Sequence, residues 1–130
     1  KAQISQGADV VYHAAGATGI GVLQAAADEG VLGIGVDKNQ NHLHPGKVLT
    51  SMLKRVDVAV YNSFSAGAEL ESGFVGLNLA NDGVGYAMDE HNAALVSEAM
   101  VASVEAAKKS IIEGSLVVHD FMSDNSCPVE

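Results

Sequence analysis

The stretch ADVVYHAAGATGIGVLQAAADEG, residues 8–30, decides the fold. A short apolar run, β-branched at its centre, predicts a buried strand within residues 8–15. Three glycines follow this run: Gly16, Gly19 and Gly21. Apolar residues at helical spacing then predict a helix over residues 18–29, which Gly30 closes. A strand, a glycine loop and a helix in this order begin an α/β unit.

Apolar runs and helical patterns continue to alternate along the chain. Further strands are predicted at residues 31–37, 47–53, 74–82, 84–89 and 116–121. Helices are predicted at residues 55–67 and 92–114, and the end of another at 1–7. This order predicts an α/β fold in which helices flank a mostly parallel sheet. Ligands of such sheets bind at the carboxyl ends of the strands, which is where candidate site residues are sought.

Length and composition limit the function classes. A chain of 130 residues, 48% of them hydrophobic, fits one domain with a real core. Its net charge is -9 and it has no basic run, which argues against a nucleic-acid partner. Cys127 is the only cysteine, so it forms no internal disulfide. The chain begins at Lys1, inside what reads as a helix end, so we expect it to be a piece of a longer protein.

Three candidate residues stand at predicted strand ends: Gly16, Asp37 and Lys54. The helix after the Gly16 loop offers free N–H groups to a hydroxyl, carboxylate or phosphate. An ionised Asp37 only accepts hydrogen bonds, which suits a pair of vicinal sugar hydroxyls. The helix dipole disfavours Lys54 at a helix start, which favours a bond to a sugar oxygen or to Asp37. Plain structural roles stay open: a tight turn for the glycine, a loop cap for Asp37 and a solvated surface position for Lys54.

Other chemistries find less support. The glycine order G-x-x-G-x-G is not the dinucleotide pattern G-x-G-x-x-G, although Asp37 follows Gly16 by 21 residues, near the expected ~20. A dinucleotide site therefore stays open as an alternative. His42 and His44 have metal-ligand spacing but no third ligand nearby, so no metal is expected. Without a catalytic triad, carboxylate pair or redox motif, we expect neither an enzyme nor a cofactor.

Three motifs in fixed order carry a resemblance to a known family. They are AAGxTGxGV at residues 14–22, IGVDxxQ at 34–40 and PGxVLTSxxKxVD at 45–57. Over roughly residues 5–121 the chain resembles the basic membrane protein family. These are the PnrA-like substrate-binding proteins of ABC transporters, many of them lipoproteins. Three ordered motifs are much more specific than one glycine pattern.

The resemblance implies a type I periplasmic-binding-protein fold, in which two α/β lobes close on a ligand. Members characterised as nucleoside binders hold purine nucleosides, with the base between aromatic side chains, and other members bind other small ligands. Transferred by motif, the residues that hold the ribose are Gly16, Asp37 and Lys54. An ABC permease partner and a periplasmic or membrane-anchored extracytoplasmic location follow from the same resemblance.

The resemblance also implies that part of the site lies elsewhere. Residues 1–122 correspond to the C-terminal portion of the binding domain, and residues 123–130 to a polar tail. The other lobe, with the base-stacking aromatics and a base-reading acid, belongs to a segment before Lys1. We therefore expect the chain alone to bind nucleoside weakly or not at all. We also expect its unfinished sheet edge to pair with another copy.

Two alternatives use the same residues. A ligand-sensing surface lipoprotein or a transcription-linked sensor would keep the fold and the site but not the permease. An NAD- or sugar-phosphate-processing enzyme domain would need an acid–base residue beside Asp37, and only Lys54 qualifies.

Overall fold

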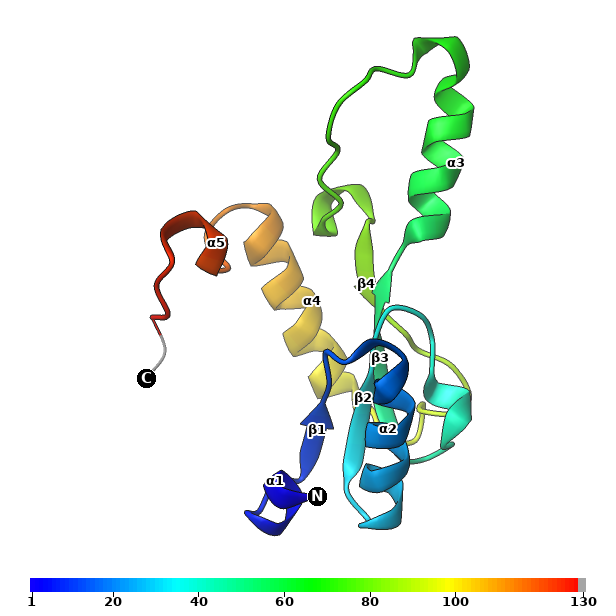
Figure 1. The fold of residues 1–130 in the computed structure, drawn as a ribbon, viewed down its shortest axis with the longest axis vertical. Helices are drawn as coiled ribbons and strands as arrows, with labels where there is room; N and C mark the ends of the chain where they lie inside the picture. The colour runs from blue at the N-terminus through cyan, green and yellow to red at the C-terminus, as the bar shows by residue number, and fades with distance from the viewer. Residues whose placement is uncertain (129–130) are drawn as a thin grey trace. The chain divides into compact units, whose positions relative to one another are not determined.

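The computed structural model describes residues 1–128, which fall into two units, residues 1–97 and a second that starts at Glu98 (Figure 1). The helices of the first unit are α1 (Ala2–Ser5), α2 (Gly19–Asp28) and α3 (Val56–Ala66). Its strands are β1 (Val10–Tyr12), β2 (Leu32–Gly35), β3 (Val48–Lys54) and β4 (Val84–Tyr86). The second unit holds α4 (Glu98–Ile112) and α5 (Phe121–Asp124). The predicted tail, 123–130, ends in two residues that lie outside the described ones.

The four strands form one mixed sheet in the order β1-β2-β3-β4. The first three are parallel, with Tyr12 opposite Ile34 and Ile34 opposite Thr50. β4 joins antiparallel, with Leu53 opposite Gly85. The predicted α/β fold with a mostly parallel sheet and flanking helices is confirmed. Because β1, β2 and β3 run the same way, their carboxyl ends meet at one edge.

Helix α2 packs on the sheet through Leu23 and Ala26, which are 1% and 0% exposed (Figure 1). β2 lacks side chains where the helix comes closest. A Cβ added to Gly33 would lie 2.6 Å from Leu23 Cδ2. The strand–loop–helix stretch thus folds as predicted. The spacing of the apolar residues on α2 and the glycines of β2 both allow the helix to pack closely on the sheet.

The interior is unusually polar for a small α/β unit. The largest fully buried side chains among the described residues are Leu23, Val48, Asn41, Asn92 and Ser51. Buried amides and hydroxyls are costly unless they are hydrogen-bonded. The three polar ones lie on the loop after β2, on β3 and after β4, so their hydrogen bonds join segments distant in sequence.

A glycine in β2 leaves the room that these bonds need. A Cβ on Gly35 would lie 2.5 Å from Ser51 Oγ and 2.9 Å from Gln40 Oε1. We expect Gly35→Ala to lower the free energy of unfolding by ~1–3 kcal/mol through overpacking. Urea unfolding measures the loss. The control is Gly21→Ala on α2, where the new methyl meets open space and should stabilise the helix by up to ~1 kcal/mol. Equal effects of the two variants would contradict this packing.

The predicted strand at 74–82 is wrong. Its alternating apolar residues are unpaired, and Phe74 and Val75 are 109% and 79% exposed. The segment bonds to itself instead. Gly83 N donates to Asn78 O at 2.8 Å, and Asn81 Nδ2 donates to Gly76 O at 2.7 Å. These local bonds use the backbone groups that a sheet ladder would need.

The predicted strand at 116–121 is also wrong. Leu116 N donates back to Ser110 O at 3.1 Å, so the chain turns at the end of α4. The Asp120 side chain then accepts from Met122 N at 2.9 Å and caps α5. Helix 92–114 is shorter than predicted at its start, because Asn92 is used in buried hydrogen bonds and α4 begins at Glu98.

Candidate ligand-binding site

The candidate site lies at the carboxyl edge of the three parallel strands. Tyr12 is the last residue of β1, Lys54 is the last residue of β3, and Asp37 comes two residues after β2. Since β2 lies between the other two strands, Asp37 stands between Tyr12 and Lys54 along the edge. This is where ligands bind in open α/β sheets.

Asp37 and Lys54 form a close ion pair. Lys54 Nζ lies 2.7 Å from Asp37 Oδ1, and the backbone N–H of Lys54 donates to Asp37 O at 2.9 Å. The side chains are 60% exposed for Lys54 and 48% for Asp37, so both are open to a ligand. Asp37 has a φ of +74°, in the left-handed region that few residues other than glycine adopt. The backbone bond to Lys54 helps to hold this conformation.

The ion pair changes the titration of the lysine. The hydrogen bond to Asp37, followed by the charge of that carboxylate, raises the pKa of Lys54, and Tyr12 adds a smaller electrostatic effect. The pair offers a sugar both acceptors, on the carboxylate, and donors, on the ammonium group.

A direct consequence is that Lys54 loses its proton at a higher pH than an unpaired lysine does. Because its folded pKa is raised, the ammonium group that pairs with Asp37 stays charged through the ordinary lysine range of ~10.4 and loses its proton only as the pH rises through the higher folded pKa. We expect NMR of the lysine Cε–Hε groups to show Lys54 titrating at higher pH than in Asp37→Asn. The control is Asp57→Asn, which removes the partner of Arg55 and should leave Lys54 unchanged. An unaltered Lys54 titration in Asp37→Asn would contradict the pair.

Gly16 opens a tight turn at the same edge. It has a φ of +52°, and the turn Gly16–Thr18 leads directly into α2. A Cβ at Gly16 would meet no atom within 4 Å, so its outer side is open. Thr18 immediately precedes α2, but its side chain makes no capping hydrogen bond. The glycine is therefore needed for backbone conformation, and the space above the turn stays free.

The turn rests on a buried histidine. His13 is 6% exposed, and a Cβ on Gly19 would overlap its ring. Both ring nitrogens lack a hydrogen-bond partner within the described part of the chain. Gly19 is thus fixed by close packing between strand end and helix start, one of the plain structural roles weighed for this loop.

Tyr12 is a further candidate residue that the sequence pattern does not single out. The pattern predicts it inside a buried strand, whereas the structure leaves its side chain 57% exposed. β1 is the outer strand of the sheet, so less covers it than the sequence pattern implies. An aromatic residue at the last position of a strand, immediately before a glycine turn, is the signal that was available.

The described residues contain no group of three or more His, Cys, Asp or Glu side chains placed to hold a metal. Among the helices of residues 1–128, none is long and apolar enough to cross a membrane.

Comparison with known proteins identifies relatives of this chain. A family model described as "ABC transporter substrate-binding protein PnrA-like" matches residues 1–120. Basic membrane protein D of Borreliella burgdorferi is 34% identical over 120 residues, covering 86% of this chain and 34% of that protein. The chain thus spans about a third of the length of this curated relative.

Two solved structures share the fold. An ABC transporter solute-binding protein from Aeropyrum pernix superposes with a TM-score of 0.71 at 27% identity, covering 92% of this chain and 43% of that one. A transcriptional activator of the comK gene from Bacillus halodurans gives a TM-score of 0.77 at 23% identity, covering 91% and 41%. The second likeness concerns the fold alone. With the family match and the shared fold, the chain belongs to the PnrA-like family of ABC transporter substrate-binding proteins.

Proposed function

We propose that this chain carries the ribose-side half of a nucleoside site, with a purine as the expected base, in the cleft of a two-lobed transport protein. Asp37 accepts hydrogen bonds from the sugar hydroxyls, Lys54 donates to a sugar oxygen, and the open turn at Gly16 lets the ligand approach the backbone. The family is one of transport proteins and not a class of enzymes, so binding without chemistry is the role assigned.

The observation that carries the proposal is the exposed Asp37–Lys54 pair, 2.7 Å apart, at the carboxyl edge. A carboxylate and an ammonium group side by side match vicinal hydroxyls, which both donate and accept. The net charge of -9 and the Asp37 carboxylate at this edge do not favour the phosphate group that a nucleotide would bring. The bare nucleoside is therefore the better ligand class.

The rest of the site would come from a second lobe. Helix α3 has no buried residue, and Val56, Val60 and Phe64 on it are 61%, 49% and 83% exposed. β1 is an edge strand. We propose that residues 1–122 are the C-terminal portion of the binding domain and that an N-terminal lobe covers such surfaces. Without that lobe, the β1 edge would pair with a second copy.

Location and partner follow from transport. The protein would work outside the cytoplasmic membrane, in the periplasm or anchored as a lipoprotein, and deliver nucleoside to an ABC permease. The basic membrane protein name of its relative is consistent with this location.

Isothermal titration tests the proposal. The full-length parent, taken as this chain extended at its N-terminus to the length of its relatives, is titrated with inosine, adenosine, guanosine, ribose and a free purine base. We expect tight binding of at least one nucleoside, weak binding of ribose or base alone, and little binding by residues 1–130. A folded parent that binds none of the nucleosides would overturn the proposal.

A further inference from the structure

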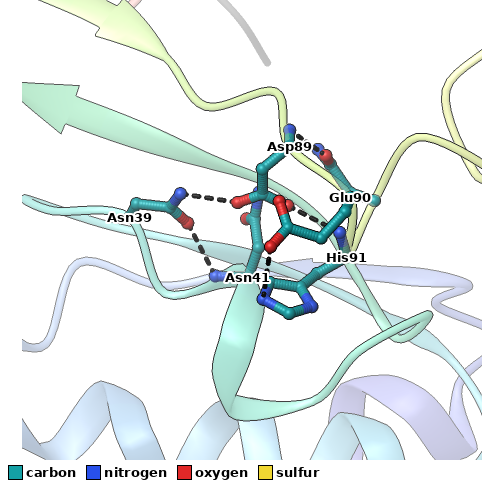
Figure 2. Close-up of polar contacts among 6 residues, drawn as sticks. Asn39, Asn41, Asp89, Glu90 and His91 are labelled. Atoms are coloured by element: carbon teal, nitrogen blue, oxygen red, sulfur yellow. Dashed lines mark hydrogen bonds and ion pairs between the residues drawn. The ribbon is translucent and has the colours of Figure 1, made fainter.

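A polar cluster joins the loop after β2 to the loop after β4, two segments that are distant in sequence. The Asp89 carboxylate accepts from Asn39 Nδ2 at 2.6 Å and from Asn41 Nδ2 at 3.2 Å (Figure 2). Its other oxygen accepts from the backbone N–H of His91 at 2.8 Å. Three donors from two segments about 50 residues apart therefore converge on one carboxylate.

The loop that Asp89 holds is the one that contains Asp37. Asn41 is fully buried, and its side-chain oxygen accepts from Ser51 Oγ on β3 at 2.8 Å. Gln40 N donates to the same hydroxyl at 3.0 Å, and Gln40 Oε1 accepts from Val36 N at 2.9 Å. The loop is thus fixed to β3 on one side and to Asp89 on the other, and Asp37 lies within it.

Only a carboxylate satisfies all the donors around residue 89. An amide in its place would turn an NH₂ group either toward the Asn39 and Asn41 amides or toward His91 N–H, so that donors would face donors. The hydrogen bond from Asn39, assisted by those from His91 and Asn41, lowers the pKa of Asp89. The group is therefore ionised at neutral pH, as this geometry requires.

We propose that Asp89 is a positioning residue for the ligand site. Through Asn39 and Asn41 it holds the loop that keeps Asp37 in its left-handed conformation and against Lys54. The hydrogen bonds of the Asp89 carboxylate come from Asn39, Asn41 and His91 and not from Asp37 or Lys54. Asp89 therefore acts on the ligand only through the loop. The consequence for affinity rests on the proposed function, whereas the consequence for the loop does not.

The test replaces Asp89 with asparagine, which keeps the shape and turns one of the two acceptor oxygens into a donor. The control is Glu90→Gln, which changes the net charge equally at a side chain that is 81% exposed and lies 3.8 Å from His91. A third variant, Asn39→Asp combined with Asp89→Asn, exchanges the amide and the carboxylate and restores the shortest contact.

Hydrogen exchange of residues 1–130 gives the first readout. We expect the amides of Lys38, Gln40 and Asn41 to exchange at least about ten-fold faster in Asp89→Asn, since a charge-assisted bond is lost. The control should match the wild type, and the exchanged pair should recover part of the protection, because it restores the Asn39 contact but not the bond from Asn41. Unchanged exchange in Asp89→Asn, or equal acceleration across the whole unit, would overturn the proposal.

Nucleoside affinity of the full-length parent gives the second readout, in a double-mutant cycle. We expect Asp89→Asn to weaken inosine binding about ten-fold in the natural background and to add little once Asp37 is alanine. Equal losses in both backgrounds would overturn the positioning role. If the wild-type parent binds no nucleoside, the proposed function fails and hydrogen exchange alone decides on Asp89.

Discussion

Asn92→Asp is expected to destabilise the first unit by at least ~3 kcal/mol at pH 7. Asn92 is 0% exposed, and its Nδ2 donates to Leu49 O at 2.9 Å and to Ala87 O at 3.0 Å. Its Oδ1 accepts from Asp89 N at 2.9 Å. The substitution places a carboxylate oxygen against two carbonyl oxygens and removes both donated bonds without changing the shape.

The loss should depend on pH in a fixed direction. Burial and the two carbonyl oxygens disfavour the charged form, so the introduced carboxyl has a folded pKa above its unfolded value of ~3.9. The variant is therefore least impaired below that pH, where the protonated acid can still donate one bond. The penalty grows as the pH rises toward the folded pKa.

Urea unfolding at pH 4 and pH 7 measures this effect. The control is Asn62→Asp on α3, at an exposed position, which should change stability by no more than ~0.5 kcal/mol. A loss at position 92 that is small at pH 7, or larger at pH 4, would contradict the buried hydrogen bonds assigned to Asn92.

Asp37→Ala is expected to weaken nucleoside binding by the full-length parent about ten- to a hundred-fold. The substitution removes a charged acceptor from the sugar hydroxyls, and bonds of this kind contribute ~1.5–3 kcal/mol. It also leaves Lys54 without its partner. The carboxylate is partly exposed, so the fold itself should persist.

Isothermal titration with inosine measures the loss, and circular dichroism checks the fold. The matched control is Asp57→Ala, which removes a nearby carboxylate that pairs with Arg55 at 3.0 Å and not with Lys54. We expect the control to bind as the wild type does. Equal affinities of all three proteins would exclude Asp37 from the site.

The strand–loop–helix stretch and the Asp37–Lys54 pair could be predicted because both follow from local rules. Helical spacing and glycine positions place α2, and the meeting of parallel strand ends brings together two residues that are 17 apart in sequence. The sequence pattern predicts Tyr12 in the core, because a pattern of apolar residues does not reveal which strand lies at the edge of a sheet.

The errors share a physical cause, which is that individual hydrogen bonds, whether local or between distant segments, leave no periodic signal in the sequence. The alternation at residues 74–82 reads as a strand, but the bond from Asn81 to Gly76 closes the segment on itself. Likewise, no local sequence pattern indicates that the Asp89 carboxylate accepts a hydrogen bond from the Asn39 amide. The residues that fix the loop of the candidate site are therefore harder to predict than the candidate residues at the strand ends.

A crystal structure of the full-length parent with inosine tests the central claim most directly. We predict that the ribose lies over the carboxyl edge of β1, β2 and β3. At least one of its hydroxyls should lie within about 3.2 Å of the Asp37 carboxylate, with Lys54 Nζ donating to a sugar oxygen. Inosine bound with its base against Asp37 and its ribose elsewhere, or bound away from this edge, would contradict the account.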